Sequence, residues 1–231
     1  MSKIIKFVAQ DDHVWEVRPR PYPAAKNVPN WWKEIPVYWD SSAKIPHTKF
    51  VTVKKCVPTI DMLTSGYYVP LWADMMVTQN EFGPELTWNV QRAVAGTWST
   101  HQSSNFNIPK NYSNLFFKNY HGWTIKTPPG WSCLFLHPVA DLDTPFLTIP
   151  GIVDTDIFDG EINVPFVIRD DFEGTIKKDT PMFQVIPFKR ENWDSEFSVK
   201  KSKQHFFDQE RLYSKMIGSY RSLTKNDKSY R

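Results

Sequence analysis

Three aspartates within six residues, Asp154, Asp156 and Asp159, are the strongest candidates for chemistry in this sequence; they lie in the stretch GIVDTDIFDGEI. Carboxylates at this spacing could orient a water molecule as a general base or hold a divalent cation. The same pattern is also typical of a hairpin turn, because aspartate readily accepts hydrogen bonds from nearby backbone N–H groups. Spacing alone leaves both interpretations open, with Asp154 and Asp156 as the candidate catalytic residues.

Local motifs for a metal or a cofactor are missing. The six histidines form no HxH, HxxxH or HxD pair, so the sequence contains no local pair of ligands typical of a zinc or iron site. The loop around Gly160 does not continue to the glutamate of an EF-hand, and the sequence contains no GxSxG, GxxxxGK[ST] or GxGxxG motif. We therefore expect no metal and no cofactor.

A second candidate site is the aromatic pair Trp31 and Trp32, within a proline- and aromatic-rich arm over residues 18–40. The prolines favour extended backbone, except over residues 29–34, where one helical turn is predicted. Together with Trp98, the pair could form an aromatic platform for a carbohydrate or a peptide. Alternatively, the arm wraps the sheet and its rings seal the core, because aromatic side chains most often supply packing area.

Residues 122–193 must position the aspartates, and they read as antiparallel sheet. Short apolar or alternating runs separated by Pro, Gly and Asp predict strands over residues 123–126, 132–136, 146–149, 161–168 and 182–187. No helical period fits between them. The predicted fold class is all-β, an antiparallel β-sandwich or a β-clip-like barrel with the N-terminal arm and a C-terminal amphipathic helix.

The remaining segments give less specific predictions. Alternation in residues 4–8 and 13–17 predicts a first hairpin, and the polar stretch over residues 93–117 predicts a long surface loop. The two cysteines, Cys56 and Cys133, are too few for a disulfide framework and are predicted to be reduced core residues.

The chain of 231 residues is long enough for one β-rich domain over residues 1–196, followed by a basic helix and tail over residues 197–231. The tail holds nine Lys or Arg against three acids, about +6, so the net charge of +3 leaves about −3 for the rest. Nucleic-acid binding is therefore not expected except through this tail. Over residues 202–220, Phe206, Tyr213, Ile217 and Tyr220 form one helical stripe, predicted to pack on the chain's own sheet.

The start MSKIIKFVAQDD lacks the apolar core and cleavage site of a signal peptide. No run approaches the roughly 18 apolar residues needed to span a bilayer. We therefore expect a soluble, intracellular protein with no membrane partner.

The motif GIVDTDIFDGEI, followed by TIKKDTPMFQVIPF, resembles the third and fourth motifs of the dUTPase and dCTP deaminase superfamily. Upstream, SGYYVPLWAD resembles the Ala-Gly-Tyr-Asp-Leu motif of that family, and TPPGW resembles the Pro-Pro-Gly turn before its second motif. The resemblance covers residues 66–188. It implies a β-clip topology, a water-activating role for Asp154 and a ligand contact for Gln184.

The sequence also departs from that family. Tyr68 stands where the first motif has aspartate, Ile157 stands where a base-stacking tyrosine is expected, and the arginine-serine-serine phosphate-binding motif is missing. A bound triphosphate would lack the hydrogen-bond donors that the arginine-serine-serine motif supplies. The resemblance therefore favours a related topology over an enzymatic activity.

Up to Trp193, the chain also resembles an uncharacterised family encoded by tailed, especially marine, bacteriophages. The segments that carry this resemblance are YPAAKNVPNWWKEIP, CVPTIDMLTSGYYVPLWAD, TPPGWS and QVIPFKRE. The resemblance implies a location in the host cytoplasm or in the virion. It implies no mechanism.

The main hypothesis is a phage-encoded, non-catalytic protein of interaction or assembly, with a protein partner or self-association. The alternative is a divergent dUTPase-like nucleotide-binding enzyme with Asp154 as general base and Gln184 as a ligand contact. A third is a carbohydrate-binding module that uses exposed tryptophans. The sequence does not specify a small-molecule ligand.

Overall fold

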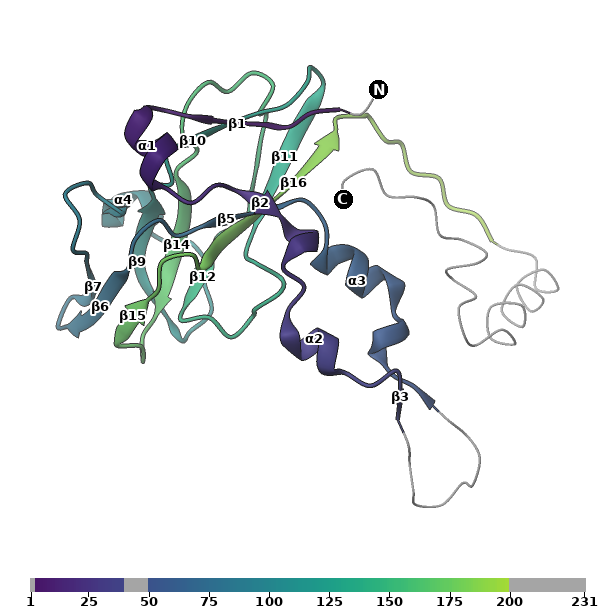
Figure 1. Cartoon of the computed structure of the whole chain (residues 1–231), viewed down its shortest axis with the longest axis horizontal. Helices are drawn as coiled ribbons and strands as arrows, with labels where there is room; N and C mark the ends of the chain where they lie inside the picture. The colour runs from purple at the N-terminus through teal and green to yellow at the C-terminus, as the bar shows by residue number, and fades with distance from the viewer. Residues whose placement is uncertain (1–2, 40–49, 200–231) are drawn as a thin grey trace.

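The structure, a computed structural model, describes residues 3–39 and 50–199. The predicted helix over residues 202–220 lies outside the described residues. Within them the chain is β-rich and its strands pair antiparallel, so the coarse fold prediction is confirmed. Figure 1 shows most strands gathered in one body, while the segment with α2 (Asn30–Glu34), α3 (Val57–Leu63) and β3 (Tyr38–Trp39) extends to one side.

The strands form two larger sheets and three smaller groups within the described residues, and none of these sheets closes on itself. One larger sheet runs in the order β13 (Gly151–Val153), β11 (Trp131–Leu136), β16 (Pro181–Lys189), β5 (Tyr67–Pro70), β2 (Tyr22–Pro23). The other runs β12 (Phe146–Thr148), β14 (Val164–Arg169), β9 (Tyr112–Asn119), β8 (Ala95–Thr97). The smaller groups are β15 (Gly174–Ile176), β6 (Met75–Asn80), β7 (Gly83–Thr87); β1 (Lys6–Ala9) with β10 (Trp123–Lys126); and β3 (Tyr38–Trp39) with β4 (Phe50–Val51).

The main core draws on both larger sheets. Phe135 of β11 and Phe183 of β16 have ring centroids 5.9 Å apart, and Phe146 of β12 and Phe166 of β14 have centroids 6.3 Å apart. All four rings are at most 2% exposed. Each buried ring contributes about 1.5–3 kcal/mol relative to an exposed one.

All five strands predicted between residues 122 and 193 are present, as β10, β11, β12, β14 and β16. The structure adds β13 and β15, which have three residues each. β12 is equally short and was predicted, but neither GIV of β13 nor GTI of β15 forms an apolar run of strand length.

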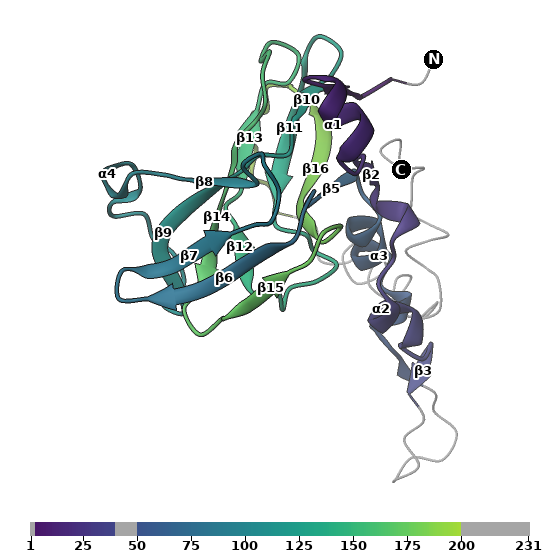
Figure 2. The same cartoon turned by 60° about the vertical axis from the view of Figure 1, so that its left-hand side comes forward.

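The helices are short and surround the sheets, as Figure 2 shows for α1, α2 and α3 along one side. Their bounds are α1 (Asp12–Val17), η1 (Ala24–Lys26), α2 (Asn30–Glu34), η2 (Val53–Lys55), α3 (Val57–Leu63) and α4 (Thr100–Ser103). The helical turn predicted over residues 29–34 is confirmed by α2. No helix among the described residues has the length and apolar character needed to cross a bilayer.

The predicted N-terminal hairpin is wrong. Residues 13–17 belong to α1, and β1 pairs with β10 instead. The helix begins because Asp11 caps it, accepting a hydrogen bond at Oδ1 from the Val14 amide at 2.9 Å. The alternation of residues 13–17 resembled a strand, but the local cap determines the backbone.

Two other predictions also need correction. The predicted surface loop over residues 93–117 contains β8, α4 and the start of β9, and Val94, Phe116 and Phe117 are buried. Cys133 is buried as predicted, whereas Cys56 is exposed at the N-cap of α3. The loop was predicted because most residues around α4 are polar, although apolar residues before and after them are buried.

Gly66 allows the turn before β5 to approach β16 closely. Its φ of +65° lies in the left-handed region, and a Cβ there would overlap the carbonyl oxygen of Val185. Gly130 also has a positive φ, +81°, but a Cβ on it would meet nothing within 4 Å. A side chain at Gly66 would therefore add both backbone strain and a steric overlap, whereas a side chain at Gly130 would add backbone strain alone.

Gly66→Ala is expected to lower the free energy of unfolding by about 3 kcal/mol or more, because it adds a backbone overlap to the left-handed strain. Gly130→Ala, the matched control, should cost only about 1–2 kcal/mol. Urea denaturation of both variants measures the difference. Equal losses would show that β16 does not restrict this turn.

His121 is buried in the core and neutral. The Trp123 amide donates to Nδ1 at 3.1 Å, so Nε2 carries the proton and donates to the Ile162 carbonyl at 2.9 Å. Burial, with a smaller effect of nearby Arg18, lowers the pKa of His121 to about 4. The unfolded chain therefore binds a second proton on this imidazole more readily than the folded protein does.

The folded pKa of His121 lies below its unfolded value, so its contribution to stability is present above about pH 6.5 and is lost as the pH falls to about 4. Unfolding followed in urea from pH 7 to 4 should show a loss of about 3 kcal/mol from this group. His121→Gln should reduce that loss, and the exposed control His101→Gln should retain it. Identical slopes for all three proteins would contradict the assignment.

Candidate functional site

The aspartate-rich stretch follows β13 and forms a turn. The backbone amides of Ile157 and Phe158 both donate to the Asp154 carbonyl, at 3.0 and 2.8 Å. Asp159, with a side chain 84% exposed, forms an ion pair with Lys126 at 2.9 Å. The turn separates Asp159 from Asp154 and Asp156, which face the end of β16.

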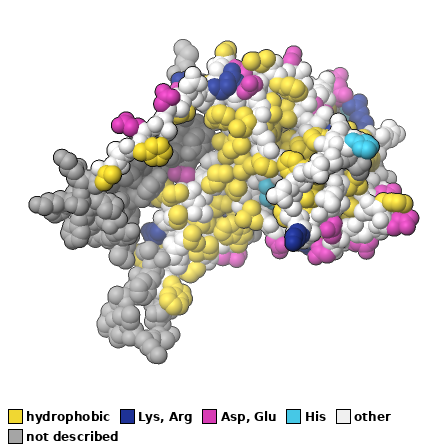
Figure 3. Space-filling model, turned by 180° about the vertical axis from the view of Figure 1, so that it is seen from behind, with side chains coloured by type: hydrophobic (Ala, Val, Ile, Leu, Met, Phe, Trp, Pro, Cys, Tyr) yellow, Lys and Arg dark blue, Asp and Glu magenta, His cyan; other side chains and the backbone are white. Residues whose placement is uncertain are grey.

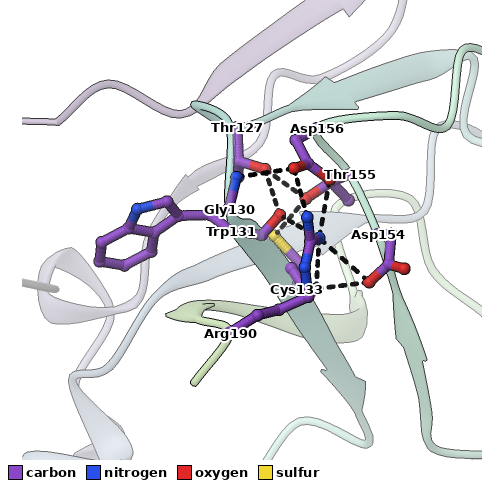
Figure 4. Close-up of polar contacts among 9 residues, drawn as sticks. Thr127, Gly130, Trp131, Cys133, Asp154, Thr155, Asp156 and Arg190 are labelled. Atoms are coloured by element: carbon purple, nitrogen blue, oxygen red, sulfur yellow. Dashed lines mark hydrogen bonds and ion pairs between the residues drawn. The ribbon is translucent and has the colours of Figure 1, made fainter. Parts of the chain in front are cut away.

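Arg190, directly after β16, holds Asp154 and Asp156 together (Figure 4). Its two terminal nitrogens bind both oxygens of Asp156, at 2.7 and 2.5 Å, a bidentate arrangement. One of them also lies 3.2 Å from Asp154 Oδ1 and 3.0 Å from the Ser132 hydroxyl. One guanidinium thus neutralises part of two carboxylates, and no cation is needed for that purpose.

Asp156 is the more tightly held carboxylate, and its side chain is only 7% exposed. Besides Arg190, the Gly130 amide donates to its Oδ2 at 2.8 Å. The bonds from Arg190, supported by this amide, lower the pKa of Asp156 to about 2. Asp156 therefore remains ionised at neutral pH and is a poor proton acceptor.

Asp154 is more open to solvent, with its side chain 56% exposed. The Ser132 hydroxyl donates to Asp154 Oδ1 at 2.6 Å, so the same oxygen has contacts to both Ser132 and Arg190. Ser132 itself is fully buried beneath these groups. Asp154 is therefore both open to solvent and bonded to β11 through Ser132.

The groups beneath the ion pairs are unsuited to nucleophilic chemistry. Cys133 is fully buried, and burial raises the pKa of its thiol to about 11. The Thr155 hydroxyl donates to Cys133 Sγ at 3.3 Å and lies 2.7 Å from the Thr127 hydroxyl. A thiol with so high a pKa is not a thiolate at neutral pH, so this cluster stabilises the turn.

An apolar row lies on the same face of the sheet as Asp154. Its member on β13 is two residues before Asp154 in the chain. Cross-strand pairing places Leu134 of β11 beside Ile152 of β13 and Ile186 of β16. We call these three residues the outer row. Ile152 is 64% exposed, Leu134 and Ile186 are half-buried, and none of the three belongs to the buried clusters of the described core. The ion-pair cluster therefore borders an apolar surface.

Gln184, a predicted ligand contact, lies on this face of β16 beneath α3 and is fully buried. Its Nε2 donates to the Ser65 carbonyl at 2.6 Å and to the Met62 carbonyl at 3.3 Å, and its Oε1 accepts from the Val139 amide at 3.4 Å. The amide thus joins β16 to the turn before β5. The structure does not bring Gln184 to Asp154.

The candidate tryptophans are divided between different clusters. Trp32 is 4% exposed and packs in the cluster with Ala24, Leu63 and Tyr68, while Trp31 is 47% exposed and donates to the Ala140 carbonyl at 2.8 Å. Trp98 packs elsewhere, stacked on Phe116. The structure therefore brings Trp31 and Trp32 together edge to face, with centroids 5.9 Å apart, without Trp98.

A hollow of about 860 Å³ lies beside the loop between α4 and β9. It is lined by groups that include Phe82, Phe106, Lys110, Asn114 and Asp170, and Asp154 and Asp156 are not among its lining residues. Among the residues that the structure describes, no group of three or more His, Cys, Asp or Glu side chains is placed to hold a metal ion. The acids and the polar loop thus remain separate features.

Arg190 and Ser132 are the members of this site that the sequence patterns did not identify. Arg190 lies 58 positions from Ser132, and only the pairing of β11 with β16 makes them neighbours. The signal that could have revealed Arg190 was a cation at the end of a predicted strand, with unpaired acids at the end of another. Only the register of the paired strands shows that these two strand ends lie side by side.

Asp156→Asn is expected to reduce the loss of stability in strong acid. The pKa of Asp156 is lowered in the folded protein, so its contribution is present above about pH 4 and is lost as the pH falls toward 2. Urea midpoints measured between pH 5 and 2.5 should fall less steeply in the variant than in the wild type. Asp159→Asn, with only an exposed ion pair removed, should keep the wild-type profile; a flattened profile in that control would refute the assignment.

A scan against protein-family models gives no match, and searches of curated proteins and of solved structures give no significant match either. The resemblances to the dUTPase superfamily and to bacteriophage proteins therefore stay predictions from short motifs.

Proposed function

We propose that this protein is a non-catalytic, phage-encoded interaction or assembly protein. The observation that carries the proposal is the outer row, an apolar strip of Ile152, Leu134 and Ile186. It lies half open beside a cluster in which Arg190 pairs with Asp154 and Asp156. Apolar surface bordered by polar groups is typical of a protein–protein contact. The acids at its end orient a turn and leave the sheet face available to a partner.

The finer architecture is part of the same proposal. We infer that the two larger sheets form a sandwich- or β-clip-like core, supported by the buried phenylalanines that both contribute. In such an arrangement each sheet has one inner and one outer face. The outer row then lies on the face turned away from the core.

One observation favours the alternative, a divergent nucleotide-binding enzyme: the exposed carboxylate of Asp154. Two contacts oppose it. The amide of Gln184 is already occupied by Ser65 and Met62, and Arg190 is engaged by Asp156. A phosphate group would have to compete with the aspartates for the guanidinium. For the carbohydrate-binding alternative, the favourable observation is the half-exposed ring of Trp31.

Thermal unfolding with nucleoside mono-, di- and triphosphates tests the proposal against the enzyme. A ligand at 100 times its dissociation constant adds about 2.7 kcal/mol, which raises Tm by roughly 5–10 °C for a chain of this size. We expect no such shift. A shift that Asp154→Asn abolishes and Asp159→Asn retains would overturn the proposal in favour of the nucleotide site. A change in tryptophan fluorescence with oligosaccharides that Trp31→Ala abolishes would overturn it in favour of the carbohydrate module.

A further inference from the structure

Residues 190–199 leave the end of β16 as an extended arm, which Figure 1 shows running clear of the body. Every residue of this arm is exposed, and Trp193, Phe197 and Val199 are 85, 94 and 96% exposed. Within the described part of the chain, no hydrogen bond or ion pair joins residues 192–199 to the body. Large apolar side chains exposed together on one short segment mark a candidate contact surface.

The arm alternates like a strand. Trp193, Ser195, Phe197 and Val199 fall on one side of an extended chain, and residues 192, 194, 196 and 198 are Asn, Asp, Glu and Ser. In Figure 3 the arm accordingly carries both hydrophobic and acidic side chains. An extended segment with one apolar face fits an apolar surface and keeps its acids in water.

The outer row offers such a surface on the same polypeptide. It crosses three neighbouring strands at one level, and Phe188 of β16 lies on the same face, one level closer to the arm. To cover Ile186 of its own sheet, the chain would have to reverse direction after Arg190. The arm instead bends at the end of β16 and runs away from the body (Figure 1). An arm that leads away from its own sheet can meet the outer row of a second copy without such a reversal.

We propose that the arm of one copy lies on the outer row of a second copy, and that the exchange is reciprocal. A two-fold pair of this kind closes on itself and leaves no free arm. Burying Trp193 and Phe197 removes roughly 300–500 Å² of surface per arm. Two arms, together with the sheet faces they cover, exceed the roughly 1,000 Å² expected of a specific interface. The inference rests on the proposed assembly function and specifies its partner.

Analytical ultracentrifugation of the full chain over a concentration series tests the exchange. The wild type should be a dimer, and both the arm variant Trp193→Ser/Phe197→Ser and the face variant Ile152→Asp should be monomers. Leu142→Ser, which removes a side chain 75% exposed elsewhere on the body, is the matched control and should remain dimeric. All the substituted side chains are exposed, so circular dichroism should show folded proteins throughout.

Mixing the two monomeric variants distinguishes exchange from other pairings. The arm variant keeps an intact outer row and the face variant keeps an intact arm, so the mixture should form heterodimers with one restored contact, weaker than wild type. A wild type that stays monomeric at 100 μM, or a dimer that survives Ile152→Asp, would overturn the proposal. A nucleotide-induced rise in Tm would count against the assembly function itself, whereas a monomer without such a rise would overturn the arm exchange only.

Discussion

The structure depends on the antiparallel pairing of β16 with β11 on one side and β5 on the other. Hydrogen bonds satisfy the backbone of this strand along both edges, and Phe183 and Val185 fill the core from its inner face. The outer face carries Gln184, whose buried amide fixes the turn before β5. The end of the same strand delivers Arg190 to the aspartates. One strand thus links the core, the polar cluster and the arm.

The polar cluster shows how acids can serve the conformation of the chain. Asp156 is shielded from water and would be unstable there without a partner, and the bidentate contact with Arg190 supplies one. Asp154 shares the same guanidinium and ties the turn to Ser132. The carboxylate pattern that suggests catalysis in the sequence is thereby accounted for by ion pairing across two strands and a turn.

Features set by short-range patterning were predictable from the sequence. The strands around Phe135, Phe166 and Phe183 are short apolar or alternating runs bounded by turn residues, and α2 begins after a proline. The helix α1 was missed because a single capping contact from Asp11 outweighs an alternating pattern. The exposure of Cys56 was missed because the local sequence does not reveal which side of a helix start faces solvent.

Features that need strand register could not be predicted. Nothing near Arg190 in the sequence indicates that Asp156 lies opposite. The same is true of the outer row, whose members come from three separate strands. Each of these contacts exists only once the sheet is assembled.

The continuity of the arm with β16 has a mechanical consequence. Hydrogen bonds between antiparallel strands lie perpendicular to the strand axis. A pull on residues 190–199 along that axis would therefore load the bonds to β11 and β5 in shear, all together and not one after another. A tether attached through this arm would transmit tension directly into the central strand of the five-stranded sheet.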